Sequence, residues 1–428
     1  MSTTNPITGW PDGPPPGSNR VPTTIANVEH MLGHGGIEVR YNIIKKDMEI
    51  TIPGEPGTPD NRDNVRMSRI FSRAAQHGLS TRHLAEYVQA IGDAHAYNPV
   101  AEWIASKPWD GCDRLPAMLA TITTADDYPA ALKATLLTKW LLSAAAGALK
   151  SNAFKARGVL VLQGSQGIGK TSWIKRLVSD VTLRDEVVRL DHHMDWANKD
   201  SLLGAVNNWI VELGELEGTL RRELPPLKSF VTADVDKVRR PYDRRESVYP
   251  RRTVFAATVN DASFLIDPTG NTRWWTLAVE RLDYLHNVDT QQLFAQLAGI
   301  LDEDATWWLT DDEERALEAW NARHRSISAI GEQVAGAVDT SATSKEPREF
   351  MTASDVLRRI GYKQPTNAQA KECGAALREL YGEPRKRDSL MKWNVRLKSA
   401  DPAAWVKPET KIVSDVPGLP PAPAEDVF

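Results

Sequence analysis

Short apolar runs separated by amphipathic segments occupy the middle of the chain. Short, mostly apolar runs occur at 158–163, 209–212 and 253–258, and such runs are typical of strands buried on both faces of a parallel sheet. An apolar, alanine-rich segment at 128–149 comes before them and predicts a long helix. Together these segments predict an α/β domain built on one parallel sheet.

Weaker patterns flank this core. Alternation of apolar and polar positions from Gly36 to Ile52 predicts a two-stranded hairpin. Helical periodicity follows through 65–91 and 99–104, and a turn at 108–111 interrupts it. We therefore expect a small α+β accessory domain before the core.

The chain becomes helical and acidic beyond Val279, with apolar positions spaced for one helix face from Leu293 to Leu301. Near the C-terminus, the segments 352–360 and 367–381 predict two helices, and the alternating segment 391–397 predicts a strand after them. The expected domain boundaries are a disordered tail at 1–24, the accessory domain at 25–125, the core at 126–326, a linker at 327–348, a C-terminal domain at 349–400 and a disordered tail at 401–428.

Composition narrows the class of protein. The 428 residues carry 52 basic and 56 acidic side chains, a formal net charge of -4, so binding of nucleic acid would need a local basic patch. The two cysteines, Cys112 and Cys373, exclude a disulfide framework and a cysteine-cluster zinc site and favour a reducing, cytoplasmic location. No run of about 18 apolar residues occurs, so we expect no contact with a membrane.

The clearest motif follows the first apolar run. The sequence Gly-Ser-Gln-Gly-Ile-Gly-Lys-Thr at 164–171 matches the phosphate-binding loop pattern and lies between a predicted strand and a predicted helix. In this motif Lys170 reaches the β and γ phosphates of a nucleotide, and the Thr171 hydroxyl binds Mg²⁺. The residues expected to bind the nucleotide are Gly164, Ser165, Gln166, Gly167, Ile168, Gly169, Lys170, Thr171 and Ser172.

Polar residues follow the other two apolar runs. Glu212 ends the second run and Glu215 follows it three residues later. A hydrolytic nucleotide site needs an acid there to hold Mg²⁺ and orient the attacking water. The spacing does not decide which glutamate lies nearest the metal. Asn260 follows the third run, where its amide could hold the attacking water. The alternative is a solvated helix cap for the two glutamates and a turn asparagine that bonds to the local backbone for Asn260.

One arginine stands beside two aromatic residues in the segment Asn-Thr-Arg-Trp-Trp at 271–275. Arg273 could neutralise transition-state charge at the nucleotide of a neighbouring subunit, as an arginine finger does. Stacking on Trp274 is the alternative.

The segment 237–252 is strongly basic. It holds seven Lys or Arg residues against two carboxylates, so it could follow a phosphate backbone. A solvated charged surface is the alternative.

In combination these motifs resemble the virulence-associated E family, the phage and mobile-element members of the superfamily 3 helicases within the AAA+ ATPases. The resemblance covers roughly 98–279. The motifs that carry it are Asn98-Pro-Val, Trp109-Asp-Gly111, Gln163 to Thr171, Trp209 to Leu216, Leu227 to Thr232 with Asp236 and Arg240-Pro-Tyr242, Phe255 to Asn260 and Gly270 to Trp275.

The resemblance implies an AAA+ P-loop ATPase that unwinds DNA as a ring, usually a hexamer, with ATP and Mg²⁺. It implies catalytic roles for Lys170, Glu212, Glu215 and Asn260 in one subunit and for Arg273 from the next. Because relatives often have two arginines where this chain has Thr272-Arg273, the finger assignment depends on one residue. The DNA-contacting residues that it implies are Lys237, Arg239, Arg240, Tyr242, Arg244 and Arg245.

The expected partners are single-stranded and forked DNA, further copies of this chain and a separate primase or replication protein, because no primase domain is evident before the core. The C-terminal segment 352–397 is similar to a winged-helix module. Two other functions stay open. A replication initiator would bind ATP without processive unwinding, and a small-molecule or polynucleotide kinase would use the same phosphate loop.

Overall fold

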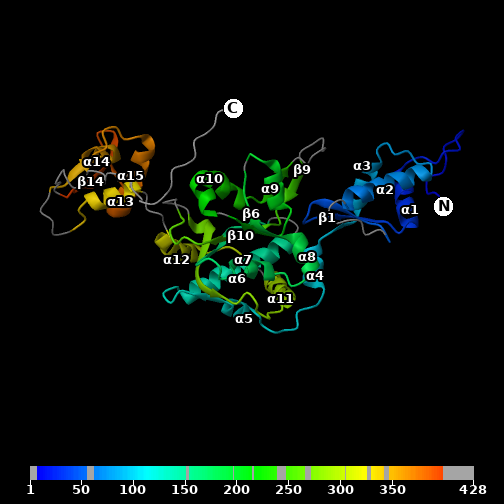
Figure 1. The fold of residues 1–428 in the computed structure, drawn as a ribbon, viewed down its shortest axis with the longest axis horizontal. Coiled ribbons are helices and arrows are strands. Elements are labelled where there is room, and N and C mark those ends of the chain that lie inside the picture. The colour runs from blue at the N-terminus through cyan, green and yellow to red at the C-terminus, as the bar shows by residue number, and fades with distance from the viewer. Residues whose placement is uncertain are drawn as a thin grey trace, which may run out of the picture. The chain divides into compact units, whose positions relative to one another are not determined.

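The chain divides into two compact units, Met1–Arg325 and Ser326–Phe428 (Figure 1). No helix in the described part of this computed structural model is long and apolar enough to cross a lipid bilayer. The residues that the structure describes are 7–54, 62–150, 154–195, 197–214, 216–238, 247–265, 271–303, 305–324, 329–341 and 347–398.

The first part of the larger unit packs helices on a small sheet, in which the predicted hairpin at 36–52 is confirmed. The helical stretch predicted at 65–91 is split in two, because Gly78 and His83 have left-handed φ angles of 76° and 61° that interrupt a helix. The elements are α1 (Ile25–His34), β1 (Glu38–Asn42), β2 (Asp47–Thr51), α2 (Arg62–Gln76), α3 (Leu84–Ala94) and β3 (Ala96–Tyr97), with strand order β2-β1-β3.

The core of the larger unit is a mixed sheet of six strands among the described residues. Five strands run parallel, and β4 pairs antiparallel with β11 at one edge. In spatial order the strands are β4 (Ile122–Thr124), β11 (Trp274–Leu282), β5 (Val159–Gln163), β10 (Val254–Val259), β7 (Ile210–Leu213) and β6 (Val188–His192). The predicted α/β class with a parallel sheet is confirmed.

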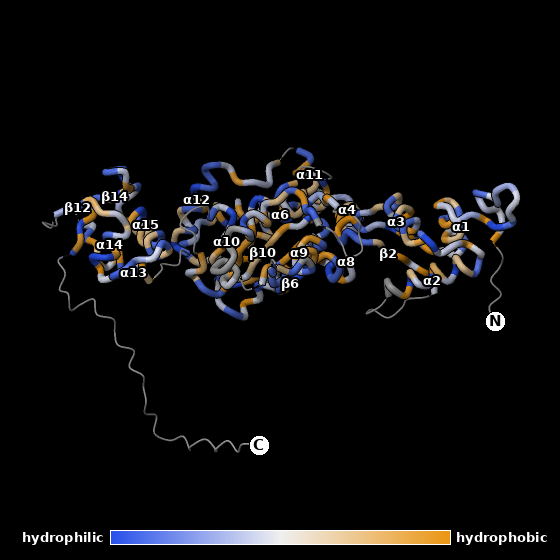
Figure 2. The backbone as a smooth tube through the Cα atoms, turned by 90° about the horizontal axis from the view of Figure 1, so that it is seen from above, coloured by the Kyte–Doolittle hydropathy of each residue, from blue (hydrophilic) through white to orange (hydrophobic). Residues whose placement is uncertain are grey.

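Alternate residues of the central strands enter two separate hydrophobic cores. Leu160 and Leu162 of β5 belong to one core, and Val159 and Val161 belong to the other, as the two-residue period of a strand requires. Figure 2 shows the hydrophobic colour concentrated along strands such as β10. The sheet is therefore covered on both faces, which explains why its central strands are continuous apolar runs in the sequence.

Helices cover these two faces unequally (Figure 1). The larger layer contains α4 (Pro99–Ala105), α5 (Leu115–Ala120), α6 (Ala130–Leu149), α7 (Lys170–Arg176), α8 (Val181–Val187), α11 (Thr290–Asp302) and α12 (Asp311–Asn321). The opposite face carries α9 (Lys199–Val206) and α10 (Leu216–Val231). Buried tryptophans attach α6 to the sheet: Trp140 Nε1 donates to Phe255 O at 2.8 Å, and Trp209 Nε1 donates to Ala144 O at 2.8 Å.

Two core strands differ from the sequence-based expectation. β11 begins at Trp274 and continues to Leu282, so the helical segment expected beyond Val279 starts only at Thr290. Trp274 and Trp275 are buried, as expected for core tryptophans. β6 was not predicted, because it is an edge strand with several exposed positions and therefore lacks an apolar run.

The second unit has the two predicted helices and the predicted strand, with further strands beside it. The three-stranded sheet of its described residues has the order β12-β14-β13, and Cys373 and Trp393 lie in its core. The elements are α13 (Ala329–Ala337), β12 (Glu349–Met351), α14 (Ala353–Arg359), α15 (Asn367–Tyr381), β13 (Arg385–Arg387) and β14 (Leu390–Val395).

Candidate functional site

The glycine-rich loop 164–171 joins β5 to α7 at the carboxyl edge of the central sheet. Gly167 and Gly169 have φ angles of 84° and 91°, which glycine adopts without steric cost. A Cβ at Gly169 would overlap the ring of Tyr284, so this position excludes a side chain. Gly164 and Lys170 are buried, Ile168 is half-buried, and Ser165, Gln166, Thr171 and Ser172 are exposed.

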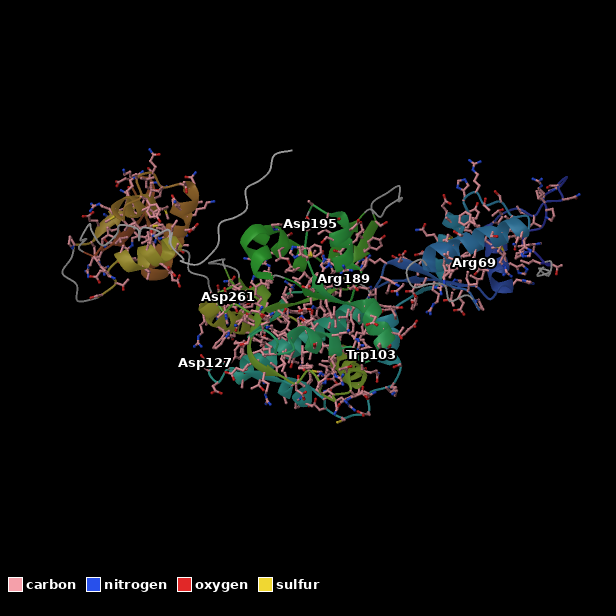
Figure 3. The ribbon with its side chains drawn as sticks, viewed as in Figure 1. Arg69, Trp103, Asp127, Arg189, Asp195 and Asp261 are labelled. Carbon is pink, nitrogen blue, oxygen red and sulfur yellow. The ribbon has the colours of Figure 1, made fainter. Side chains whose placement is uncertain are left out.

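Lys170 connects the loop to the next strand. Its side chain is buried, and its ammonium donates hydrogen bonds to Gly164 O at 2.7 Å, Ser165 O at 2.8 Å and Asn260 Oδ1 at 2.9 Å. Asn260 follows β10, the strand beside β5, and Figure 3 labels its neighbour Asp261. The structure therefore brings together the predicted lysine and the predicted asparagine.

Glu212 lies beside the same loop. It is 1% exposed, and its Oε1 accepts hydrogen bonds from Thr171 Oγ1 at 2.7 Å and from Thr258 Oγ1 at 2.9 Å. Burial raises the pKa of the Glu212 carboxyl above its ordinary value of 4.5, although the two hydroxyl donors oppose the shift. The carboxylate is thus costly to leave charged, and a cation beside it would remove that cost.

Asp191 is a site residue that the sequence patterns did not indicate. Its backbone N–H lies 3.4 Å from Glu212 Oε2, and its charge contributes to the raised pKa of Glu212. Asp191 has a φ angle of 51° and lies on β6, near Arg189, which Figure 3 labels. The signal that could have found it is an acid near the end of a short β-branched run, which is weak on an edge strand.

A magnesium ion fits the oxygen atoms of Thr171 and Glu212. A hydroxyl and a carboxylate are ligands that Mg²⁺ accepts, with waters and substrate phosphates completing its shell. The Thr171–Glu212 contact holds both oxygens together beside the loop. No group of three or more His, Cys, Asp or Glu side chains suited to a protein-only metal site occurs in the described ranges.

Of the two remaining predicted catalytic residues, the structure describes only Arg273, which does not join this cluster. Glu215 lies outside the described residues. Arg273 ends the short 3-10 helix η1 (Asn271–Arg273), just before the start of β11, where Trp274 pairs with Val159. That is the amino edge of the sheet. The glycine-rich loop lies at the other end of β5, which is five residues or roughly 16 Å long.

The basic segment begins and ends in a two-stranded hairpin. β8 (Val235–Val238) pairs antiparallel with β9 (Ser247–Pro250), and Lys237 is exposed on β8. The other predicted DNA-contacting residues, Arg239, Arg240, Tyr242, Arg244 and Arg245, lie outside the described residues.

Arg251 and Arg252, which also contribute to the basic pattern, have structural contacts. Arg251 is fully buried and forms an ion pair with Asp236, with its guanidinium 4.6 Å from the Phe230 ring centre. Arg252 donates to Ala148 O at 3.2 Å. These two arginines anchor the base of the hairpin. The formal charge of the segment is therefore larger than the charge that it exposes to solvent.

Comparison with known proteins identifies the family of the core. Two solved structures of the NrS-1 C-terminal region are similar to this chain at 14% identity: the first covers 87% of this chain and 98% of its own with a TM-score of 0.41, and the second covers 87% and 99% with a TM-score of 0.35. No curated protein sequence is significantly similar. The model of the virulence-associated protein E-like domain matches residues 104–326, more than half of the chain. The loop, the acid and the asparagine described above all lie within this match, and the chain belongs to the virulence-associated protein E-like family.

Proposed function

We propose that this protein is an ATP-dependent DNA helicase of phage or mobile-element replication, which hydrolyses ATP to move along and unwind DNA as a ring-shaped oligomer. The observation that carries the proposal is the connected set of side chains at the carboxyl edge of the sheet. Lys170 contacts Asn260, and Thr171 contacts Glu212. A loop that only turned the chain would not need these polar contacts between three separate strands.

Each of these groups has a chemical role in cleavage of a triphosphate. Lys170 neutralises charge on the β and γ phosphates, and Asn260 orients the attacking water. Thr171 and Glu212 would hold Mg²⁺, which neutralises phosphate charge. The water oxygen bonds to the γ phosphorus, the bond to the β–γ bridging oxygen breaks, and the water proton passes to an acid for which Glu215 is the candidate.

The position of Arg273 supports assembly into a ring. Its Nε is buried and has no hydrogen-bond partner among the described residues, and it lies at the edge of the sheet opposite the loop. An arginine that served its own subunit's nucleotide would need to lie at the carboxyl edge. If the amino edge of one core faces the nucleotide of the next core in the proposed ring, Arg273 would act there as the finger.

The hairpin supports contact with DNA. Its base is fixed by the buried Asp236–Arg251 ion pair, and Lys237 extends from it into solvent. The sequence between its two strands includes four arginines at 239, 240, 244 and 245, and arginines suit a phosphate backbone. We propose that this hairpin holds the translocating strand.

We also propose that the second unit is winged-helix-like. Two helices, α14 and α15, precede the β13–β14 hairpin, and the three basic residues of β13, Arg385 to Arg387, are exposed. This order and this charge support a module that lies against duplex DNA ahead of the fork.

Strand displacement from a forked duplex tests the proposal. The wild-type protein should release the labelled strand when ATP and Mg²⁺ are present, and Lys170→Ala should not. Binding and local melting without strand release would favour an initiator. Phosphate transfer to a DNA end or a nucleoside would favour a kinase.

A further inference from the structure

The residues that would hold the γ phosphate lie on one side of β5. Asn260 follows β10 and Glu212 lies on β7, and both strands are on the same side of β5 in the sheet. The loop 283–289 follows β11, which pairs with the opposite side of β5. Because a nucleotide extends away from its γ phosphate, its sugar and base must leave the glycine-rich loop toward another wall.

The loop 283–289 touches the glycine-rich loop and its helix. The Tyr284 ring packs against Gly169, where it excludes a Cβ. Arg176 of α7 donates from Nε to His286 O at 3.0 Å, and Trp173 of α7 donates from Nε1 to Thr121 Oγ1 at 2.8 Å. The phosphate-binding segment and this second loop are therefore one connected structure.

An open cavity of about 490 Å³ lies beside these contacts. Its size falls in the range of roughly 300–1,000 Å³ that is common for small-molecule sites. One wall comes from α5 and the other from the loop, and a hydrogen bond from Asp283 N to Thr121 O at 2.8 Å joins them. The residues that line the cavity include Ala117, Thr121, His286, Asn287 and Val288.

The imidazole of His286 lies in this wall. It is 4% exposed, and neither of its ring nitrogens has a hydrogen-bond partner in the described structure. Burial and the charge of Arg176 lower the pKa of His286, so the ring is neutral and offers one N–H donor and one acceptor. Buried polar atoms are normally paired, and the edge of a nucleobase carries both donors and acceptors.

We propose that this cavity is the nucleobase subsite of the triphosphate site, with His286 and Asn287 contacting the base edge. The inference rests on the proposed function, because it takes the phosphates to lie in the loop 164–171. The subsite gives the protein affinity for nucleoside triphosphates over bare polyphosphate.

A variant that fills the cavity tests this assignment. Ala117 lies on the exposed face of α5 and lines the cavity, so Ala117→Trp adds bulk there without removing a core contact. Leu285→Ala is the matched control, because Leu285 belongs to the same loop and is 67% exposed. The measured quantities are KM and kcat for ATP hydrolysis and the inhibition constant of inorganic tripolyphosphate, which has no base.

Ala117→Trp should raise the KM for ATP by about tenfold and leave kcat nearly unchanged, the signature of lost uniform binding. Asn287→Ala should act in the same direction with a smaller change. Inhibition by tripolyphosphate should be equal in all variants, and Leu285→Ala should match the wild type.

The possible failures are distinguishable. If tripolyphosphate inhibits the wild type while Ala117→Trp leaves the KM for ATP unchanged, the base binds elsewhere and the proposed function stands. If Ala117→Trp weakens the binding of tripolyphosphate as much as that of ATP, the substitution disturbs the phosphate-binding loop and not a base subsite, and the inference is wrong. If the wild type neither hydrolyses ATP nor binds tripolyphosphate, both proposals are wrong.

Discussion

The carboxyl and amino edges of the central sheet differ in how their polar groups are satisfied. At the carboxyl edge, Lys170 and Glu212 are buried and bonded to side chains from neighbouring segments. At the amino edge, Arg273 has an Nε without a partner among the described residues, and the β8–β9 hairpin leads into β10. The first edge has side-chain contacts within one chain, whereas the second carries the groups that we propose to contact another subunit and DNA.

This difference suggests a division of labour in the proposed motor. In the proposed motor the carboxyl edge would carry out the phosphate chemistry, because the Lys170–Asn260 and Thr171–Glu212 contacts hold its polar groups together. The amino edge would become complete only in an assembly with another subunit and DNA.

A large loss of turnover is expected from Glu212→Gln at the carboxyl edge. Turnover of ATP should fall on the order of 100-fold, the scale that follows removal of one preorganised electrostatic contact. The amide keeps the size of the side chain, so the protein should stay folded. Glu280→Gln is the control, because Glu280 is exposed on β11. Equal turnover for both variants would remove Glu212 from the site.

Mixing of two inactive variants tests the amino edge. Arg273→Ala and Lys170→Ala should each lack turnover. In rings assembled at random from an equal mixture, about one quarter of the shared sites combine an intact loop with an intact arginine, so about one quarter of the wild-type turnover should return. Arg281→Ala, an exposed arginine near the other end of β11, is the control and should be active alone. A mixture that stays inactive would place Arg273 outside a shared site.

The ion pair below the hairpin is expected to affect stability. Arg251→Ala leaves Asp236 buried without its partner and should lower the free energy of unfolding by about 3–5 kcal/mol. Arg315→Ala breaks the exposed Arg315–Asp312 pair and should cost less than about 1 kcal/mol. Urea unfolding followed by circular dichroism measures both. An equal loss in the free energy of unfolding for the two variants would show that the Arg251–Asp236 pair does not anchor the hairpin base.

The smallest effect concerns pH and the metal. The pKa of Glu212 is raised, so its carboxyl keeps a proton at a higher pH than an ordinary glutamate does. Because Mg²⁺ needs the ionised form, the apparent affinity for Mg²⁺ should fall as the pH decreases through the raised pKa, by up to about tenfold per pH unit. Titration of Mg²⁺ against bound nucleotide at several pH values measures this. Glu212→Gln should bind Mg²⁺ weakly and with less pH dependence. If the wild type and Glu212→Gln had the same pH profile of Mg²⁺ affinity, Glu212 would not be the ligand that titrates.

Much of the carboxyl edge could be predicted from the sequence. The loop 164–171 and Asn260 each follow a buried apolar strand, and Glu212 lies near the end of another. In a parallel sheet the carboxyl ends of such strands meet at one edge. The structure adds their direct contacts.

Other features depend on contacts that no local pattern encodes. Asp191 reaches Glu212 because the polar strand β6 pairs with β7. Arg251 has the same sequence context as the other basic residues of its segment, and only the fold shows that Asp236 and Phe230 enclose it. The unpartnered His286 is likewise a product of packing between α5 and the loop after β11.

ATP hydrolysis by wild type, Lys170→Ala and Lys175→Ala, each with and without single-stranded DNA, tests the central claim most directly. Lys170 is buried against Asn260, whereas Lys175 is an exposed lysine on the same helix, α7. Wild type and Lys175→Ala should hydrolyse ATP faster when DNA is present, and Lys170→Ala should lose turnover by more than about 100-fold. Equal rates in all three proteins, or no hydrolysis by the wild type with or without DNA, would contradict the account.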